Sequence, residues 1–269
     1  MLRNVRRDPE TLRHLCEGVA MKRLLAAVVF LAVSFSTGCS PNAASSVPVA
    51  SSGSTNLGVA GSGALVTKDL SVRDFSEVEV DSSFKVEITR SESFAVAVTA
   101  DDNVIDMVDV TQSGQTLRIG LKPGSYNNAT YRASISMPDL KRLEMAGASI
   151  GTLTGFRPRV LDLDLSGASQ LTGRLEGGQI NLAVREASLA NLGGSADVVA
   201  LTASGASHAS LGDLAASTGR ASLREASTAT VNVEDKLDVD LRGASNLYYV
   251  GNPSLESVSS VEGSSLRHR

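Results

Sequence analysis

Two pairs of carboxylates are the clearest candidates for chemistry, because each pair lies on one face of a predicted strand. Asp162 and Asp164 form the first pair, and Asp238 and Asp240 form the second. Carboxylate oxygens at such a spacing are ligands that Ca²⁺ accepts. Two of the predicted strands between the pairs carry Asn181, Ala183, Ala200 and Thr202 at the matching places, so the acids form no continuous column. We therefore predict solvated strand faces without a metal.

Two Arg–Glu dipeptides recur where predicted strands end, two repeat units and so about 10 Å apart in a stack. They could form a charged patch that docks a partner. We favour the alternative, in which each Arg pairs with its neighbouring Glu on a solvated surface and contributes little to stability. Because Glu resists a left-handed backbone, its presence predicts corners that do not require a positive φ. The candidate ligand or partner contacts are Arg185, Glu186, Arg224, Glu225, Asp162 and Asp164.

Nucleophilic catalysis has little support in the sequence. Downstream of residue 38 the histidines are His208 and His268. Asp213 and several serines lie near His208 in sequence, but no nucleophile elbow of the G-x-S-x-G type occurs. Phosphate-binding loops and the C-x-x-C and H-E-x-x-H motifs are also missing from the sequence. We predict no catalytic residue, no metal and no cofactor.

Aromatic side chains bear on sugar binding, because their rings offer apolar area to a sugar ring. Aromatic residues are only 4% of the chain and tryptophan is absent. Tyr248 and Tyr249 are consecutive, so on a strand they point to opposite sides and one is expected to face inward. The tyrosines that could serve are Tyr126, Tyr131, Tyr248 and Tyr249.

These candidates are positioned by a repeated tripeptide, Gly/Glu-Ala-Ser. The central residues of seven copies are separated by 20, 19, 19, 20, 18 and 20 residues. A period in this range is typical of a solenoid in which each unit makes one coil. The copies begin at Gly147, Gly167, Glu186, Gly205, Glu225, Gly243 and, in degenerate form, Gly263.

Each tripeptide follows a stretch in which apolar and mostly polar residues alternate. A period of two predicts a strand with one buried face, and a second short strand follows each tripeptide. The tripeptide is then a corner, and the fold is predicted to be all-β: a single-domain parallel β-helix with about 19–20 residues per coil. Parallel crossovers favour a right-handed winding. Leu163, Leu182 and Leu201 should then stack in a single file.

The serine of each tripeptide would recur at every corner. Stacked hydroxyls could present a ligand-binding row on the surface. We favour the alternative, in which each hydroxyl bonds to the corner backbone or to its neighbour in the stack. The serines concerned are Ser149, Ser169, Ser188, Ser207, Ser227, Ser245 and Ser265.

Residues 65–140 also alternate, but less regularly, and are predicted to form irregular first coils that cap the open end. The Phe75–Ile88 segment, the Leu117–Ile119 strand, the Met137–Leu140 step and the following corners together resemble the bacterial family of auto-transporter adhesin head GIN domains. The resemblance extends from about Leu65 to the C-terminus. It implies a β-helical, exported and often lipid-anchored protein, and it transfers no functional residues.

The N-terminal segment is predicted to direct export. Residues 1–20 carry four arginines and no apolar run, so we interpret them as lying upstream of the true start at Met21. Residues 21–38 have the charged and apolar regions of a lipoprotein signal peptide. Small residues precede Cys39, which is the predicted lipidation site, although Ser36 stands where this motif usually has leucine.

Residues 39–64 are rich in Ser, Ala and Gly and are predicted to be a flexible tether, which leaves residues 65–269 as the folded domain. Residues 1–38 carry six basic and three acidic side chains, so their removal changes the formal charge from −4 to −7. An acidic chain disfavours adsorption to nucleic acid. A monomer is expected.

These observations predict a non-catalytic, lipid-anchored protein of the cell envelope, at the outer membrane or the periplasmic face, whose β-helix serves adhesion or scaffolding. The expected partners are the membrane, through the lipid, and a glycan or an envelope protein. The alternative is a carbohydrate-active enzyme, because some exported β-helices cleave acidic polysaccharides. Scattered acids and nearly constant coil lengths argue against that alternative.

Overall fold

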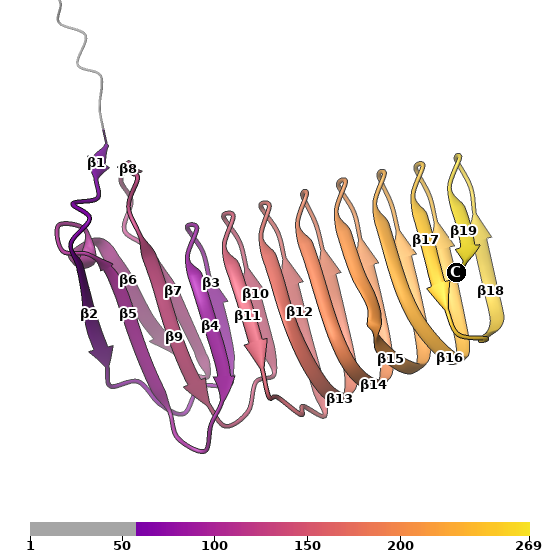
Figure 1. The fold of residues 1–269 in the computed structure, drawn as a ribbon, viewed down its shortest axis with the longest axis horizontal. Helices are drawn as coiled ribbons and strands as arrows, with labels where there is room; N and C mark the ends of the chain where they lie inside the picture. The colour runs from indigo at the N-terminus through magenta and orange to yellow at the C-terminus, as the bar shows by residue number, and fades with distance from the viewer. Residues whose placement is uncertain (1–57) are drawn as a thin grey trace, which may run out of the picture. The chain divides into compact units, whose positions relative to one another are not determined.

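The alternating residues form strands, and the strands wind into parallel coils that stack one on the next (Figure 1). The structure is a computed structural model that describes residues 58–269. Within that range the secondary structure consists of strands and one short 3-10 helix, Ile105–Met107. The predicted all-β solenoid of stacked parallel coils is thereby confirmed. The right-handed sense of the winding stays a prediction.

The strands fall into an irregular first part and a regular second part. The first part contains β1 (Val59–Ala60), β2 (Leu65–Leu70), β3 (Glu77–Val80), β4 (Lys85–Arg90), β5 (Ala95–Asp101), β6 (Val108–Ser113), β7 (Thr116–Leu121), β8 (Tyr126–Asn127) and β9 (Tyr131–Met137). The second part contains β10 (Arg142–Met145), β11 (Ile150–Thr154), β12 (Val160–Leu165), β13 (Gln170–Val184), β14 (Leu189–Ala203), β15 (His208–Leu223), β16 (Thr228–Leu241), β17 (Asn246–Val250), β18 (Ser254–Ser260) and β19 (Ser265–His268).

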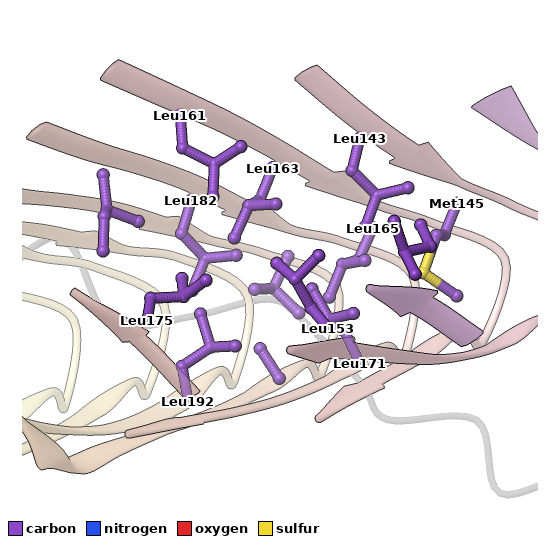
Figure 2. Close-up of a cluster of buried hydrophobic side chains, with 14 of the residues drawn as sticks. Leu143, Met145, Leu153, Leu161, Leu163, Leu165, Leu171, Leu175, Leu182 and Leu192 are labelled. Atoms are coloured by element: carbon purple, nitrogen blue, oxygen red, sulfur yellow. The ribbon is translucent and has the colours of Figure 1, made fainter. Parts of the chain in front are cut away.

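The register between coils builds the core. Leu163 of β12 lies opposite Leu182 of β13, which in turn lies opposite Leu201 of β14. This confirms the predicted single file of leucines. Figure 2 shows Leu163 and Leu182 among the leucines of adjacent coils. Each inward side chain has to fill only the space between neighbouring coils, so small aliphatic residues suffice for a close-packed interior.

The corners differ from the prediction in their backbone. The first two corner residues have positive φ values, 64° at both Gly147 and Ala148, and 55° and 64° at Glu186 and Ala187. The N–H of Ser149 also bonds to the carbonyl three residues earlier, at 3.3 Å, which is the pattern of a type I′ turn. The expectation that Glu excludes a positive φ at the corner is therefore wrong.

A ladder of hydrogen bonds explains why the corners tolerate Glu and Ala in this conformation. The N–H of the second corner residue donates to the carbonyl of the first corner residue in the next coil, as from Ala168 to Glu186 at 3.0 Å. The six bonds of this kind between Ala148 and Glu262 measure 2.7–3.0 Å. Left-handed backbone costs a non-glycine residue about 1–2 kcal/mol, and this repeated bond offsets that cost.

The corner serines bond to the backbone, as the favoured interpretation predicts. The six serines from the corners between residues 147 and 245 are at most 2% exposed, so they form no accessible row. The Ser169 hydroxyl donates to the Ser166 carbonyl at 2.6 Å, and the Ser207 hydroxyl donates to the Val184 carbonyl of the previous coil at 2.8 Å.

The last corner is displaced by one residue from its predicted place. Positive φ values fall on Glu262 and Gly263, so the copy is Glu262–Ser264 and not Gly263–Ser265. The Ser264 hydroxyl accepts the N–H of Ser245, just as the Ser188 hydroxyl accepts the N–H of Ser169. Backbone geometry defines this copy, because its sequence no longer contains the central alanine.

The first part forms the irregular coils that the sequence predicts. β3 and β4 form a coil with its own corner, Ser82–Ser83, where φ is 68° and 64°, and this coil pairs in parallel with β10 and β11. β7 and β9 pair in parallel with β3 and β4 to form the coil beyond it. β2, β5 and β6 then add antiparallel pairings and cover this end (Figure 1).

The folded part starts before residue 65. β1 pairs in parallel with β8, and the Asp101 carboxylate accepts the N–H groups of Gly63 at 2.6 Å and Thr130 at 2.7 Å. The predicted tether is therefore too long at its C-terminal end. Its Ser- and Gly-rich composition conceals this order, because backbone groups make most of the contacts.

Asp101 should make this attachment sensitive to acid. The hydrogen bonds from Thr130 and Gly63 lower its pKa below the ordinary value. A depressed pKa contributes stability above the unfolded value of about 3.9, and that contribution is lost as the pH falls through the folded pKa. We expect Asp101→Asn to speed hydrogen exchange at Gly63 and Thr130 by about tenfold or more at neutral pH. Asp109→Asn, at an exposed position of β6, is the control, and equal exchange in both variants would contradict the assignment.

Several predictions lie outside the described residues, namely the upstream segment 1–20, the signal peptide 21–38, the lipidation of Cys39 and the tether before residue 58. Within residues 58–269, no helix has the length and apolar character needed to cross a membrane.

Candidate functional site

Asp162 and Asp164 belong to the outward positions of β12, where both bond to the next coil. The Asp162 carboxylate accepts a hydrogen bond from the Asn181 side chain at 2.7 Å. Asp164 forms an ion pair with Arg185. Among the described residues, no group of His, Cys, Asp and Glu side chains has the arrangement of a metal site. The two acids therefore serve contacts between coils.

The acidic face extends further toward the N-terminus than the sequence indicates. Glu144 lies opposite Asp164, and Glu79 lies opposite Glu144. Arg118 pairs with Glu79 at 3.1 Å and Arg142 pairs with Glu144 at 2.8 Å. The bond to Glu144 raises the pKa of Arg142. The sequence missed this column, because Glu79 belongs to a coil whose corner is Ser82–Ser83 and not Gly-Ala-Ser.

The predicted pairing of Arg with the neighbouring Glu is wrong. Arg185 pairs with Asp164, and Arg224 lies 3.8 Å from Asp240. Arg185 follows buried Val184 and so shares the outward face with Asp164. Glu186 instead accepts the N–H of Gly167 at 3.1 Å. The six candidate contact residues thus divide into strand-face residues that bond to the neighbouring coil and residues of the corners.

The two corner glutamates allow a matched stability test. Glu186 and Glu225 have φ of 55° and 57°, and glycine adopts this region without steric cost. We expect Glu225→Gly to raise the free energy of unfolding by about 0.5–1 kcal/mol. Glu186→Gly should gain less, because it loses the bond to Gly167. Urea denaturation measures both, and a loss of stability in Glu225→Gly would contradict the assigned strain.

His208 does not assemble a catalytic group. It lies in register with Leu189 on one side and Thr228 on the other, so no acidic residue neighbours it in the stack. Tyr249 packs against the core as the inward member of its pair and lies 4.9 Å from the His268 ring. Arg269 lies over the Tyr248 ring, at 4.2 Å from its centroid. The aromatic and charged side chains at this end therefore contact one another within the last coils.

The coil of β7 and β9 lacks a tight corner, and a hollow results. Residues 122–130, which include β8, connect these strands beside the Ser82–Ser83 corner. The hollow between them has a volume of about 560 Å³. Its lining residues are Ser82, Ser83, Leu121, Lys122, Pro123, Gly124, Ser125, Tyr126, Asn128, Ala129 and Tyr131.

A stack of parallel coils, with paired charges outside and an aliphatic interior, places this chain among the β-solenoid proteins. Residues 74–253 match the family described as "Putative auto-transporter adhesin, head GIN domain". The chain belongs to this family, which confirms the resemblance found in the sequence.

Solved structures of similar fold come from species of Bacteroides and Parabacteroides. A putative adhesin from Bacteroides fragilis is 21% identical with a TM-score of 0.75, and the match covers 79% of this chain and 100% of that one. A putative adhesin from Parabacteroides merdae is 17% identical with a TM-score of 0.64, covering 78% and 98%. A structure from Parabacteroides distasonis, described as a putative lipid binding protein, is 16% identical with a TM-score of 0.63, covering 78% and 99%. At these identities the likeness shows the fold alone. No curated protein matches the chain at a significant level.

Proposed function

We propose that this chain is a non-catalytic, lipid-anchored protein of the bacterial cell envelope that presents a rigid solenoid for adhesion or scaffolding. The observation that carries the proposal is the pairing of outward charges between coils, as in Asp164 with Arg185 and Glu79 with Arg118. A catalytic groove needs acids and bases that converge on a substrate, whereas these groups neutralise one another across a strand face. Membership of an adhesin family supports the same assignment.

The carbohydrate-active enzyme is the weaker alternative. It would use Asp162 and Asp164, yet these two carboxylates are bonded to Asn181 and Arg185. Incubation of the protein with uronic-acid polymers tests it directly. Turnover that disappears in Asp162→Ala would overturn the non-catalytic assignment, and we expect no turnover.

Lipid anchoring is tested by growing cells with a radiolabelled fatty acid. We expect the wild-type protein to incorporate label and Cys39→Ala to incorporate none. Ser45→Ala is the control, because Ser45 lies in the predicted tether beyond Cys39 and should not affect labelling. Label that persists in Cys39→Ala would place the acylation elsewhere and contradict this part of the proposal.

Adhesion is tested with a strain that lacks the protein. We expect this strain to attach less to host-cell or polysaccharide-coated surfaces, and expression of the wild-type chain to restore attachment. Protease treatment of intact cells separates the cell exterior from the periplasmic face. Normal attachment by the deletion strain would remove the adhesion function and leave a scaffold.

A further inference from the structure

The hollow beside β8 lies where one coil departs from the repeated corner. Elsewhere in the described stack, from Ser82 to Gly263, a two-residue left-handed corner joins the strands of each coil. Between β7 and β9 the longer segment 122–130 takes its place. This segment does not pack closely onto the Ser82–Ser83 corner, and the hollow of about 560 Å³ lies between the two. The hollow is thus a local change to a regular structure at one end of the stack.

Tyr131 occupies the serine position of this modified coil. β4 and β9 pair Lys85 with Arg132, so Tyr131 and Phe84 precede them at the place that Ser149 takes in the next coil. In five of the later coils a serine hydroxyl at this position donates to a backbone carbonyl, as from Ser149 to Ala146 at 2.7 Å. Tyr131 is only 9% exposed, and its hydroxyl is buried without a hydrogen-bond partner among the described residues. A buried polar group in this state needs an explanation, and a ligand is one.

The rings around Tyr131 hold it in the wall of the hollow. The Tyr131 ring lies 5.4 Å from the Phe84 ring and 6.5 Å from the Tyr126 ring, the latter edge to face. The Tyr126 hydroxyl donates to the Lys122 carbonyl at 2.9 Å, which fixes its ring. Burial raises the pKa of Tyr131, so the hydroxyl is neutral and can both donate and accept.

The other polar groups of the wall favour a neutral ligand. Ser82, Ser125 and Asn128 supply hydroxyl and amide groups, which both donate and accept hydrogen bonds. The Lys122 ammonium donates to the Asp106 carbonyl at 2.9 Å, and its charge, after that of Lys68, lowers the pKa of the Asp106 carboxyl, so Asp106 balances part of that charge. The nearby Asp101 charge acts on Tyr131 and would repel an anion. Aromatic rings and uncharged hydrogen-bonding groups together match a sugar, which has an apolar ring face and many hydroxyls.

We propose that this hollow binds a neutral saccharide, with the Tyr126 ring against the sugar. The Tyr131 hydroxyl has almost no accessible surface in the unliganded protein, so its bond to a sugar hydroxyl forms only when the wall of the hollow shifts on binding. The inference rests on the proposed non-catalytic function and names the ligand class that an adhesive solenoid would recognise. Ser82, Ser125 and Asn128 bond to further sugar hydroxyls.

The test uses the full-length protein on an array of neutral and uronate oligosaccharides, followed by titration of the strongest neutral binder. We expect binding to neutral sugars. Tyr131→Phe should weaken it about 2- to 10-fold, the effect of one hydrogen bond between neutral groups. Tyr126→Ala should weaken it by at least as much. Tyr248→Phe, near the opposite end of the stack, is the matched control and should bind as the wild type does.

A thermal measurement separates binding from folding. Removal of a hydroxyl that has no partner should leave the melting temperature of unliganded Tyr131→Phe equal to or above that of the wild type. A lower melting temperature would mean that the hydroxyl already has a partner, and it would overturn the proposal. Binding only to uronates, or full affinity for the neutral sugar in both pocket variants, would overturn it as well.

Cell attachment distinguishes this failure from failure of the proposed function. A strain that carries Tyr126→Ala and attaches normally, while the purified variant binds no sugar, would exclude the hollow from adhesion and keep the adhesive function. A deletion strain that attaches normally, while the purified wild-type protein binds a neutral sugar, would keep the hollow and exclude adhesion.

Discussion

Replacing Leu182 by alanine is expected to lower the free energy of unfolding by about 2–5 kcal/mol. Leu182 is 2% exposed and lies in register between Leu163 and Leu201. The strand pairing fixes the spacing of the three coils at about 4.8 Å, so the neighbours cannot close the cavity that the missing side chain leaves. Urea denaturation monitored by circular dichroism measures the change.

Thr202→Ala is the control, because Thr202 follows Leu201 on β14 and is exposed on the opposite side of the strand. Its effect should stay within about 0.5 kcal/mol. In a solenoid each coil is stabilised by its neighbours, so the Leu182 variant could also unfold in two separate steps on either side of β13. A single transition with unchanged midpoint would contradict the role of this file of leucines.

The second large effect is expected at Gly194, where β14 departs from regular pairing. Its φ is 117°, and a Cβ atom built there would lie 1.8 Å from the carbonyl oxygen of Leu175 in the preceding coil. Both the left-handed backbone and the contact with a main-chain atom exclude a side chain. We expect Gly194→Ala to lower the free energy of unfolding by about 3 kcal/mol or more, measured by urea denaturation.

Gly212 of β15 offers a matched control for this substitution. Its φ lies outside the left-handed region, and an added Cβ would meet only the Thr230 methyl group, at an ordinary 3.4 Å. Gly212→Ala should therefore change stability by less than about 1 kcal/mol. Equal effects of the two substitutions would show that the close approach at Gly194 relaxes without cost.

The regular part of the fold could be predicted because the same residue types recur at a nearly fixed spacing along the sequence. A unit of nearly constant length, with apolar residues at alternate positions, places Leu163 and Leu182 one above the other without any knowledge of loops. The buried corner serines followed from the same argument, since a hydroxyl at a tight turn bonds to the nearby backbone. The family resemblance rested on segments of the irregular first part together with the regular corners, and it was confirmed.

The rest depends on contacts between residues far apart in sequence. Glu186 tolerates a positive φ because a bond from another coil compensates, which the local preference of Glu does not reveal. Arg185 pairs with Asp164, 21 residues away, and not with its neighbour. The hollow around Tyr131 arises where one corner is replaced by a longer segment, so no short motif marks it.

The ladder of corner bonds has a consequence for how such proteins change length. Each corner is bonded only to the corner before it and the corner after it, as Ala168 is to Glu186. If one whole unit were duplicated or lost, every surviving corner would therefore still have neighbouring corners that offer the same backbone hydrogen bonds. Each duplicated unit would lengthen the molecule by about 4.8 Å at unchanged cross-section. During evolution, the number of repeat units alone could thus set the distance between the N-terminal hollow and the opposite end of the stack.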